Sequence, residues 1–152
     1  MMLSINLVII AIESPLLIGI YQNHTLIESL SIEGQTSEVL PIEFQKIQDR
    51  FKVERVLFAN GPGSFMAIKI NYVFLKTIAS ILDVELFSRD AFFFNSDSPI
   101  RALKNMYFVK RGEKIFIEKV VEFKKVEFSL PLKFEKEKYS KDIEPLYILP
   151  FL

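Results

Sequence analysis

The chain contains no cysteine. This excludes disulfide bonds, thiolate zinc sites and cysteine nucleophiles, and it favours a reducing compartment, so we expect a cytoplasmic protein. Net charge is also lacking, because 19 Lys and Arg balance 19 Asp and Glu. The molecule as a whole therefore has no strong field to attract nucleic acid. With 152 residues, half of them hydrophobic, it can still form one ordinary core.

Histidine is nearly absent as well, since His24 is the single one. It follows a predicted strand in the turn-forming run at residues 22–24, where we expect a solvent-facing side chain. A paired-histidine metal site or a Ser-His-Asp triad would need partners for which the sequence offers no pattern. Ser64 likewise lacks the Gly-x-Ser-x-Gly context of a nucleophile. We therefore predict no catalytic residues and no metal site.

No Lys or Arg precedes Lys46, so the apolar N-terminal stretch has no basic region of the kind that begins a signal peptide. Glu13 and Pro15 interrupt this stretch, and residues 5–12 are far shorter than the ~20 residues of a spanning helix. We expect a buried strand here and no membrane association.

Charge is unevenly distributed along the chain. Residues 1–45 hold five acidic residues and no Lys or Arg, whereas residues 100–152 hold twelve Lys and Arg against eight acidic residues. A basic C-terminal face could lie near RNA. The alternative, which we favour, is that these charges alternate on solvated strand faces.

The first ninety residues predict three strands, a helix, a strand, a second helix and a strand, in the order βββαβαβ. The predicted strands cover residues 3–12, 16–21, 25–32, 53–59 and 84–88, and the helices cover residues 37–52 and 64–82. An α/β chain in which a meander of strands is followed by alternating helices and strands is typical of the ribonuclease H-like fold. Actin-like ATPase domains are built on that fold.

From about residue 90 the composition changes, with a Phe-rich run and then alternating strands at residues 106–110 and 114–121. Arg111, Gly112 and Glu113 fit the hairpin turn between them. Further β-like pieces lie at residues 126–128 and 132–134. We therefore divide the chain into a first lobe, residues 1–90, and a reduced β-rich second lobe, residues 91–152.

A glycine-rich loop, Gly-Pro-Gly-Ser-Phe at residues 61–65, joins the strand at 53–59 to the following helix. Backbone N–H groups at such a helix start can bind an anion, which makes Gly61, Gly63 and Ser64 candidates for nucleotide binding. The loop is neither a Walker motif nor a dinucleotide fingerprint. The competing interpretation is that the glycines form a tight turn and Ser64 caps the helix.

The helix at residues 64–82 is apolar over about 200° of its circumference, whereas a one-sided surface helix needs only ~100°. Its narrow polar strip consists of Lys69, Lys76, Ser80 and Asp83. A sheet can cover one side of such a helix. The other side must contact the helix at 37–52, the second lobe or a partner protein, and the pattern leaves these alternatives open.

Residues 61–70, GPGSFMAIKI, resemble the Gly-Pro-Gly-Ser-Phe-Thr-Gly-Leu-Arg-Ile-Gly signature of the TsaB (YeaZ) family, which acts in bacterial biosynthesis of threonylcarbamoyladenosine in tRNA. Three weaker similarities follow the same order. Residues 10–14 are similar to the first-strand Ile-Asp-Thr, residues 110–113 to the Asp-Ala-Arg-x-Gly-Glu hairpin, and residues 144–147 to the closing Glu-Pro-x-Tyr.

The resemblance implies a two-lobed actin-like fold and a non-catalytic partner of TsaD, the subunit that modifies the adenosine beside the anticodon. TsaE, an ATPase, would join the complex, and tRNA would be contacted indirectly. The chain would have no cofactor of its own, and ATP or ADP and a metal ion would bind only in the assembled complex. By analogy we expect the partner surface on the two helices, at Leu40, Phe44, Ile47, Phe65, Ile68, Lys69, Tyr72, Leu75 and Ala79.

The chain departs from the family signature at Met66, Ala67 and Lys69, and it has Glu13 where the family's first strand has Asp. The second lobe is also shortened. These departures make an independent enzyme less plausible. Two alternatives stay open: a small actin-like ATPase or kinase relative that binds nucleotide at Gly61 to Ser64, and a homodimer formed through the apolar helix.

Overall fold

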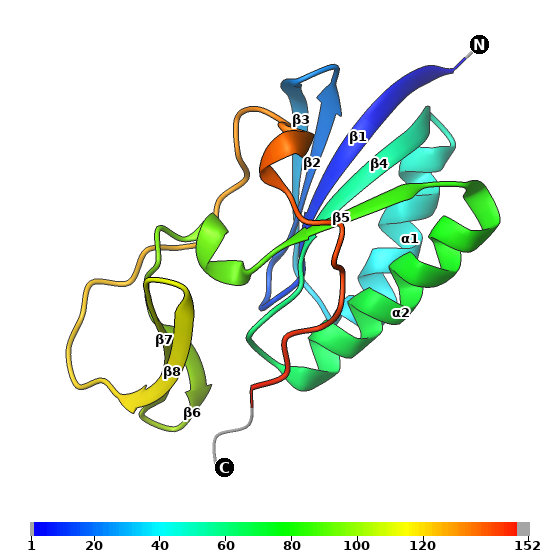
Figure 1. Cartoon of the computed structure of the whole chain (residues 1–152). Helices are drawn as coiled ribbons and strands as arrows, with labels where there is room; N and C mark the ends of the chain where they lie inside the picture. The colour runs from blue at the N-terminus through cyan, green and yellow to red at the C-terminus, as the bar shows by residue number, and fades with distance from the viewer. Residues whose placement is uncertain (1, 149–152) are drawn as a thin grey trace.

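The computed structural model describes residues 2–148 and has a mixed α/β architecture (Figure 1). Its larger part contains five strands and two α-helices in the predicted order. In chain order these are β1 (Leu3–Ile10), β2 (Leu16–Gln22), β3 (Thr25–Ile32), α1 (Thr36–Gln48), β4 (Phe51–Ala59), α2 (Phe65–Leu82) and β5 (Glu85–Arg89).

The five strands form one sheet in the order β3-β2-β1-β4-β5. The β1–β2 and β2–β3 pairs are antiparallel, and the β1–β4 and β4–β5 pairs are parallel. The predicted meander is thus confirmed, with β3 at its predicted bounds. The prediction that the first helix continues to residue 52 is wrong: α1 ends at Gln48, and Phe51 already pairs with Leu3 in the sheet.

The central strand β1 is covered on both faces. Leu7 and Ile9 belong to the core on the helix side, whereas Val8 and Ile10 belong to the core on the opposite side. Because successive side chains of a strand point to opposite faces, both sets of residues must be apolar. This explains the continuous hydrophobic run that the sequence shows at the N-terminus.

Both helices lie on the same face of the sheet, side by side (Figure 1). Leu40 and Phe44 of α1 and Leu75 of α2 are fully buried against the strands. The rings of Phe44 and Phe74 meet edge to face across the two helices, with their centroids 5.5 Å apart. This contact fixes the groove between α1 and α2 that is described below.

The second lobe contains a three-stranded antiparallel sheet, β6 (Ile100–Leu103), β7 (Met106–Arg111) and β8 (Lys114–Lys119). The 3-10 helix η1 (Ala91–Phe94) joins it to β5. The predicted hairpin at Gly112 is confirmed. The β-like pieces predicted at residues 126–128 and 132–134 are not strands, because only Lys133 forms an isolated bridge, with Thr25.

Residues 129–148, here called the return segment, run back over the first lobe (Figure 1, orange to red). It includes the short 3-10 helix η2 (Lys136–Lys138). Ser140 exchanges two backbone hydrogen bonds with Ser88 of β5, at 2.8 and 3.0 Å, and the amide of Leu146 donates to the carbonyl of Asn60 at 2.8 Å. The last part of the sequence-defined second lobe therefore packs on the first lobe.

By length and composition alone, α2 could cross a membrane. Its place in the sheet argues otherwise. The strands before and after it, β4 and β5, pair in parallel along five residues, so the helix returns the chain to the sheet that it left. Ile68, Asn71 and Leu75 of α2 are buried, and Tyr72, Phe74, Ile78 and Ala79 are partly buried against the same core. Met66, Val73 and Ile81 are exposed on the side away from the sheet.

Candidate protein–protein interface

The loop before α2 is shaped by close packing inside the chain. A Cβ atom on Gly61 would lie 2.7 Å from the carbonyl oxygen of Leu146, and one on Gly63 would lie 2.7 Å from Cγ2 of Ile12. Gly61 also has φ of +119°, a conformation that other residues rarely adopt. Both glycines are thus explained by contacts within this chain, without a ligand.

Ser64 is the N-cap of α2, and its Oγ accepts a hydrogen bond of 3.4 Å from the amide of Ala67. The capping interpretation of Ser64 is confirmed. The return segment lies over the loop, where the rings of Phe65 and Tyr147 meet edge to face at 5.3 Å. With the glycines explained by packing, nucleotide binding at Gly61 to Ser64 stays a prediction without further support.

Glu13 and His24, the two other polar residues singled out from the sequence, are engaged elsewhere. Glu13 forms an exposed ion pair with Lys125 at 3.4 Å. His24 lies in the predicted turn, but its Nδ1 is 3.0 Å from the carbonyl oxygen of Phe134, so it helps hold the return segment. Within residues 2–148, no group of His, Asp and Glu side chains is arranged to hold a metal ion.

Five of the nine predicted partner residues lie in the protein's own core, and the expectation that they face a partner is therefore corrected. Each is at most 3% exposed: Leu40, Phe44, Ile47, Ile68 and Leu75. The amphipathic pattern shows that α2 has two apolar flanks, but it does not show which flank packs on the sheet. The flank assigned to the partner is the one that the sheet covers.

The other predicted partner residues are at least partly accessible. Lys69 and Phe65 are exposed, and Tyr72 and Ala79 are half-buried. Tyr72 lies beneath Lys76, whose Nζ is 5.5 Å from the centre of its ring. These residues border the polar strip of α2 and can still contribute to a contact at its edge.

The exposed apolar surface lies on the opposite flank of α2 and extends to the start of α1. Met66, Val73 and Ile81 are 67%, 52% and 71% exposed, values that few large apolar side chains in a folded domain reach. Between the helices lies an open, mainly apolar groove of about 520 Å³. We call it the helical groove, and its lining consists of Ser37, Pro41, Met66, Lys69, Ile70, Val73, Phe74 and Thr77.

Apart from Lys69, none of the groove residues was among the predicted site residues. The signal was present in the sequence, because Met66, Ile70, Val73 and Thr77 recur at steps of three and four residues. Met66 had been noted only as a departure from the family signature. An exposed Met, Val and Ile on one helix face is typical of a surface that another protein covers.

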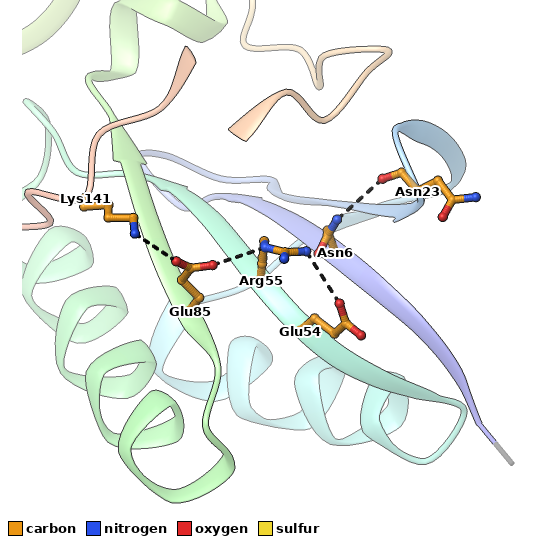
Figure 2. A network of polar contacts seen from close by, with 6 residues as sticks. All are labelled: Asn6, Asn23, Glu54, Arg55, Glu85 and Lys141. Atoms are coloured by element: carbon orange, nitrogen blue, oxygen red, sulfur yellow. Dashed lines mark hydrogen bonds and ion pairs between the residues drawn. The ribbon is translucent and has the colours of Figure 1, made fainter. Parts of the chain in front are cut away.

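On the face of the sheet opposite the helices, a polar network lies beside the second core (Figure 2). Arg55 Nε donates to Glu85 at 3.2 Å, and Lys141 Nζ lies 3.2 Å from the other oxygen of Glu85. Hydrogen bonds from Lys141 and then Arg55 hold the pKa of Glu85 below its ordinary value. Because Lys141 belongs to the return segment, the network ties that segment to β5.

The architecture places the chain in a class of mixed α/β proteins represented by solved YeaZ structures. The particular match is YeaZ from Pseudomonas aeruginosa, which is 12% identical, with a TM-score of 0.56 over 76% of this chain and 64% of that one. A second structure is described as an uncharacterized protein with similarity to peptidase YeaZ from Pseudomonas aeruginosa. It is also 12% identical, with a TM-score of 0.52 over 76% of this chain and 63% of that one.

The chain thus spans less than two thirds of the length of either structure. At this identity the similarity shows the fold alone. No protein-family model matches the sequence, and no curated protein matches it.

Proposed function

We propose that this chain is a TsaB-like scaffold subunit that binds a TsaD-like protein through the helical groove, in a cytoplasmic complex that threonylcarbamoylates tRNA adenosine next to the anticodon. A TsaE-like ATPase joins through the TsaD-like subunit. The chain itself is non-catalytic, and ATP, ADP or a metal ion binds only in the assembled complex. Its five-stranded sheet is the core of a ribonuclease H-like, actin-like first lobe, in keeping with the strand order.

The observation that carries the proposal is the exposed apolar face of α2 beside α1. Val73 lies near the middle of this face. Met66 lies on the same face toward the loop, and Ile81 lies toward the end of the helix. Two helices that present such a face can pack against two helices of another subunit. The side chains of Met66, Val73 and Ile81 would then insert between side chains of the partner helices. Lys69 at the edge adds a charge that can set the orientation of the partner.

The proposal is tested by purifying the chain with a TsaD-like protein from the same source and measuring their affinity by calorimetry. The Val73→Glu variant places a charge in the middle of the groove and should weaken binding at least tenfold. Because Val73 is exposed, the melting temperature should stay near that of the wild type. Ile42→Glu is the matched control, since Ile42 is an exposed apolar residue of α1 that does not line the groove.

If the two proteins form no complex, even with the TsaE-like ATPase and ATP present, the proposed function is wrong. If Val73→Glu binds as well as the wild type, the interface lies elsewhere on the chain. Sedimentation of the chain alone separates a third outcome, in which the same groove pairs with a second copy and the homodimer competes with the partner.

A further inference from the structure

The basic residues of this neutral chain are concentrated in one part of the fold. Residues 100–125, which comprise β6, β7, β8 and the segment after them, contain eight Lys and Arg against three Glu, a net charge of +5. Because the whole chain is neutral, the remainder carries a net charge of −5. The molecule is therefore polarised, and residues 100–125 have the charge that a polyanion requires.

The three-stranded sheet has one buried and one open face. Ile100, Phe108 and Ile117 are in register and pack toward the first lobe. The neighbouring register row, Arg101, Tyr107 and Glu118, lies on the other face, with Arg111 and Phe116 on the same side. The Arg111 guanidinium lies 5.7 Å from the centre of the Phe116 ring, which is 41% exposed. Cations, aromatic rings and the carboxylate of Glu118 thus share this open face.

A small hollow lies at the edge of this face, where the second lobe meets the end of β1. Its volume is about 170 Å³, and its aromatic wall includes Tyr107 and Phe123, whose ring centroids are 5.1 Å apart. Arg101 and Lys125 also line the hollow. Pockets for whole drug-sized molecules begin at about 300 Å³, so this one is suited to a single planar ring system.

Asn95, a side-chain amide whose oxygen has no hydrogen-bond partner among the described residues, lies at the wall of the same hollow. Asn95 is only 3% exposed, and its Nδ2 donates to the carbonyl of Ser98 at 3.0 Å. Its Oδ1 has no hydrogen-bond partner among the described residues, although buried acceptors of this kind are normally satisfied. This oxygen has almost no accessible surface, so an amino group of a nucleobase in the hollow would reach it after a local movement of the wall.

We propose that the open face of β6–β7–β8 binds single-stranded RNA, with one unpaired base entering the hollow against Tyr107 and Phe123. Phosphates would lie beside Arg101 and Arg111, and Asn95 Oδ1 would accept from the base. Aromatic rings combined with cations on a small sheet suit single strands, because every base has a π-face and each nucleotide has one phosphate. The choice of RNA rests on the proposed function in tRNA modification.

The groups that oppose an anion at this site are carboxylates. Glu13 lines the hollow and pairs with Lys125 at 3.4 Å, and Glu118 pairs with Arg111. Both pairs are solvent-exposed, so they are weak and can be exchanged for phosphate. Arg101 has no ion pair in the part of the chain that the structure describes. Glu13 can accept from a ribose 2′-hydroxyl, which distinguishes RNA from DNA.

The test uses the full chain alone and measures fluorescence anisotropy with a labelled RNA hairpin that carries a single-stranded loop. Fully paired RNA and a DNA hairpin of the same loop sequence are the comparison probes. We expect the looped RNA to bind at least tenfold more tightly than either. Arg101→Ala should weaken binding and reduce the slope of log K against log salt by about 0.7, the value for one phosphate contact.

Tyr107→Leu should weaken binding about tenfold and leave the salt slope unchanged, because stacking releases no counterions. We expect the same result for Phe123→Leu. This second variant keeps the test valid if one of the two substitutions lowers the melting temperature. Arg50→Ala is the matched control, since it removes an exposed arginine from the first lobe. It should bind as the wild type does.

Equal affinity for paired and looped RNA, or full binding by both aromatic variants, would overturn the proposal in favour of attraction by charge alone. No binding to any probe would also overturn it. Because no TsaD-like subunit is present in this experiment, either result leaves the measured affinity for that subunit as a separate test of the proposed function.

Discussion

The carbonyl oxygen of Leu146 lies 2.7 Å from the point that a Cβ atom on Gly61 would occupy. The two residues are far apart in the sequence. Two hydrogen bonds next to Gly61 nevertheless join their segments: the amide of Leu146 donates to the carbonyl of Asn60, and Asn60 Nδ2 donates to the carbonyl of Glu144 at 2.9 Å. Residues 61–70 and 144–147, which resemble two separate motifs of the TsaB family, are thus in direct contact. The loop and the return segment form a single structural unit.

Replacing Gly61 should therefore be costly. Gly61→Ala combines a φ of +119° with a backbone clash, and we expect it to lower the free energy of unfolding by about 2–4 kcal/mol. Gly112→Ala is the matched control. Gly112 also has a positive φ, +62°, but a Cβ atom there would meet nothing within 4 Å, so its loss should be about 1 kcal/mol. Urea denaturation measures the free energy of unfolding of both variants. An equal decrease in the two variants would contradict this account.

The two sides of α2 should respond differently to truncation. Leu75→Ala removes a fully buried side chain and should cost about 2–5 kcal/mol, whereas Val73→Ala on the open face should cost less than about 0.5 kcal/mol. Thermal or urea unfolding of the isolated chain checks this difference. A large loss in Val73→Ala would mean that the helical groove is covered within the chain itself.

Most of the first lobe could be predicted from its sequence, because local signals determine it. Alternating residues and the turn at Asn23 and His24 define β3, and Ser64 marks the start of α2. The end of α1 could not be placed in the same way. Phe51 continues the three- and four-residue spacing of the helix, but it pairs with Leu3 in the sheet, and that tertiary pairing overrides the local pattern.

The path of the return segment could not be predicted, because it has almost no regular periodicity. It is held by contacts with remote residues, such as the bridge between Ser140 and Ser88 and the hydrogen bond from Ser88 Oγ to the carbonyl of Asp142 at 2.7 Å. The orientation of α2 was ambiguous for a related reason. An apolar arc wider than one contact needs leaves open which flank faces the sheet, and only the packing of Leu75 decides it.

A largely buried ion pair joins the two lobes. Lys110 Nζ of β7 lies 2.9 Å from Oδ2 of Asp90 beside η1, and the two side chains are only 17% and 18% exposed. Removing one partner would leave the other charge poorly solvated, so Lys110→Ala should cost about 2 kcal/mol. In the Lys110→Ala, Asp90→Ala double variant, we expect a coupling energy of about 1–2 kcal/mol from the denaturation midpoints. Strict additivity of the single losses would show that the pair contributes nothing.

Because of Tyr21, the free energy of unfolding should depend on pH in the alkaline range. Its hydroxyl donates to the carbonyl of Pro131 in the return segment at 2.6 Å. Burial, and secondarily the charge of Tyr139, raises the pKa of Tyr21 well above its ordinary value. The unfolded chain therefore loses this proton at about pH 10, while the folded chain keeps it. Since the unfolded state then binds fewer protons, the free energy of unfolding must fall as the pH rises above about 10.

The Tyr21→Phe variant separates this effect from the hydrogen bond. At neutral pH it should be less stable by about 1 kcal/mol, because the carbonyl of Pro131 loses its donor. Above about pH 10 its stability should decline less steeply than that of the wild type, so the two curves converge. Tyr139, whose pKa is also raised by burial, supplies the remaining slope. Urea denaturation at a series of pH values measures both curves, and curves that stay parallel would show that Tyr21 ionises equally in both states.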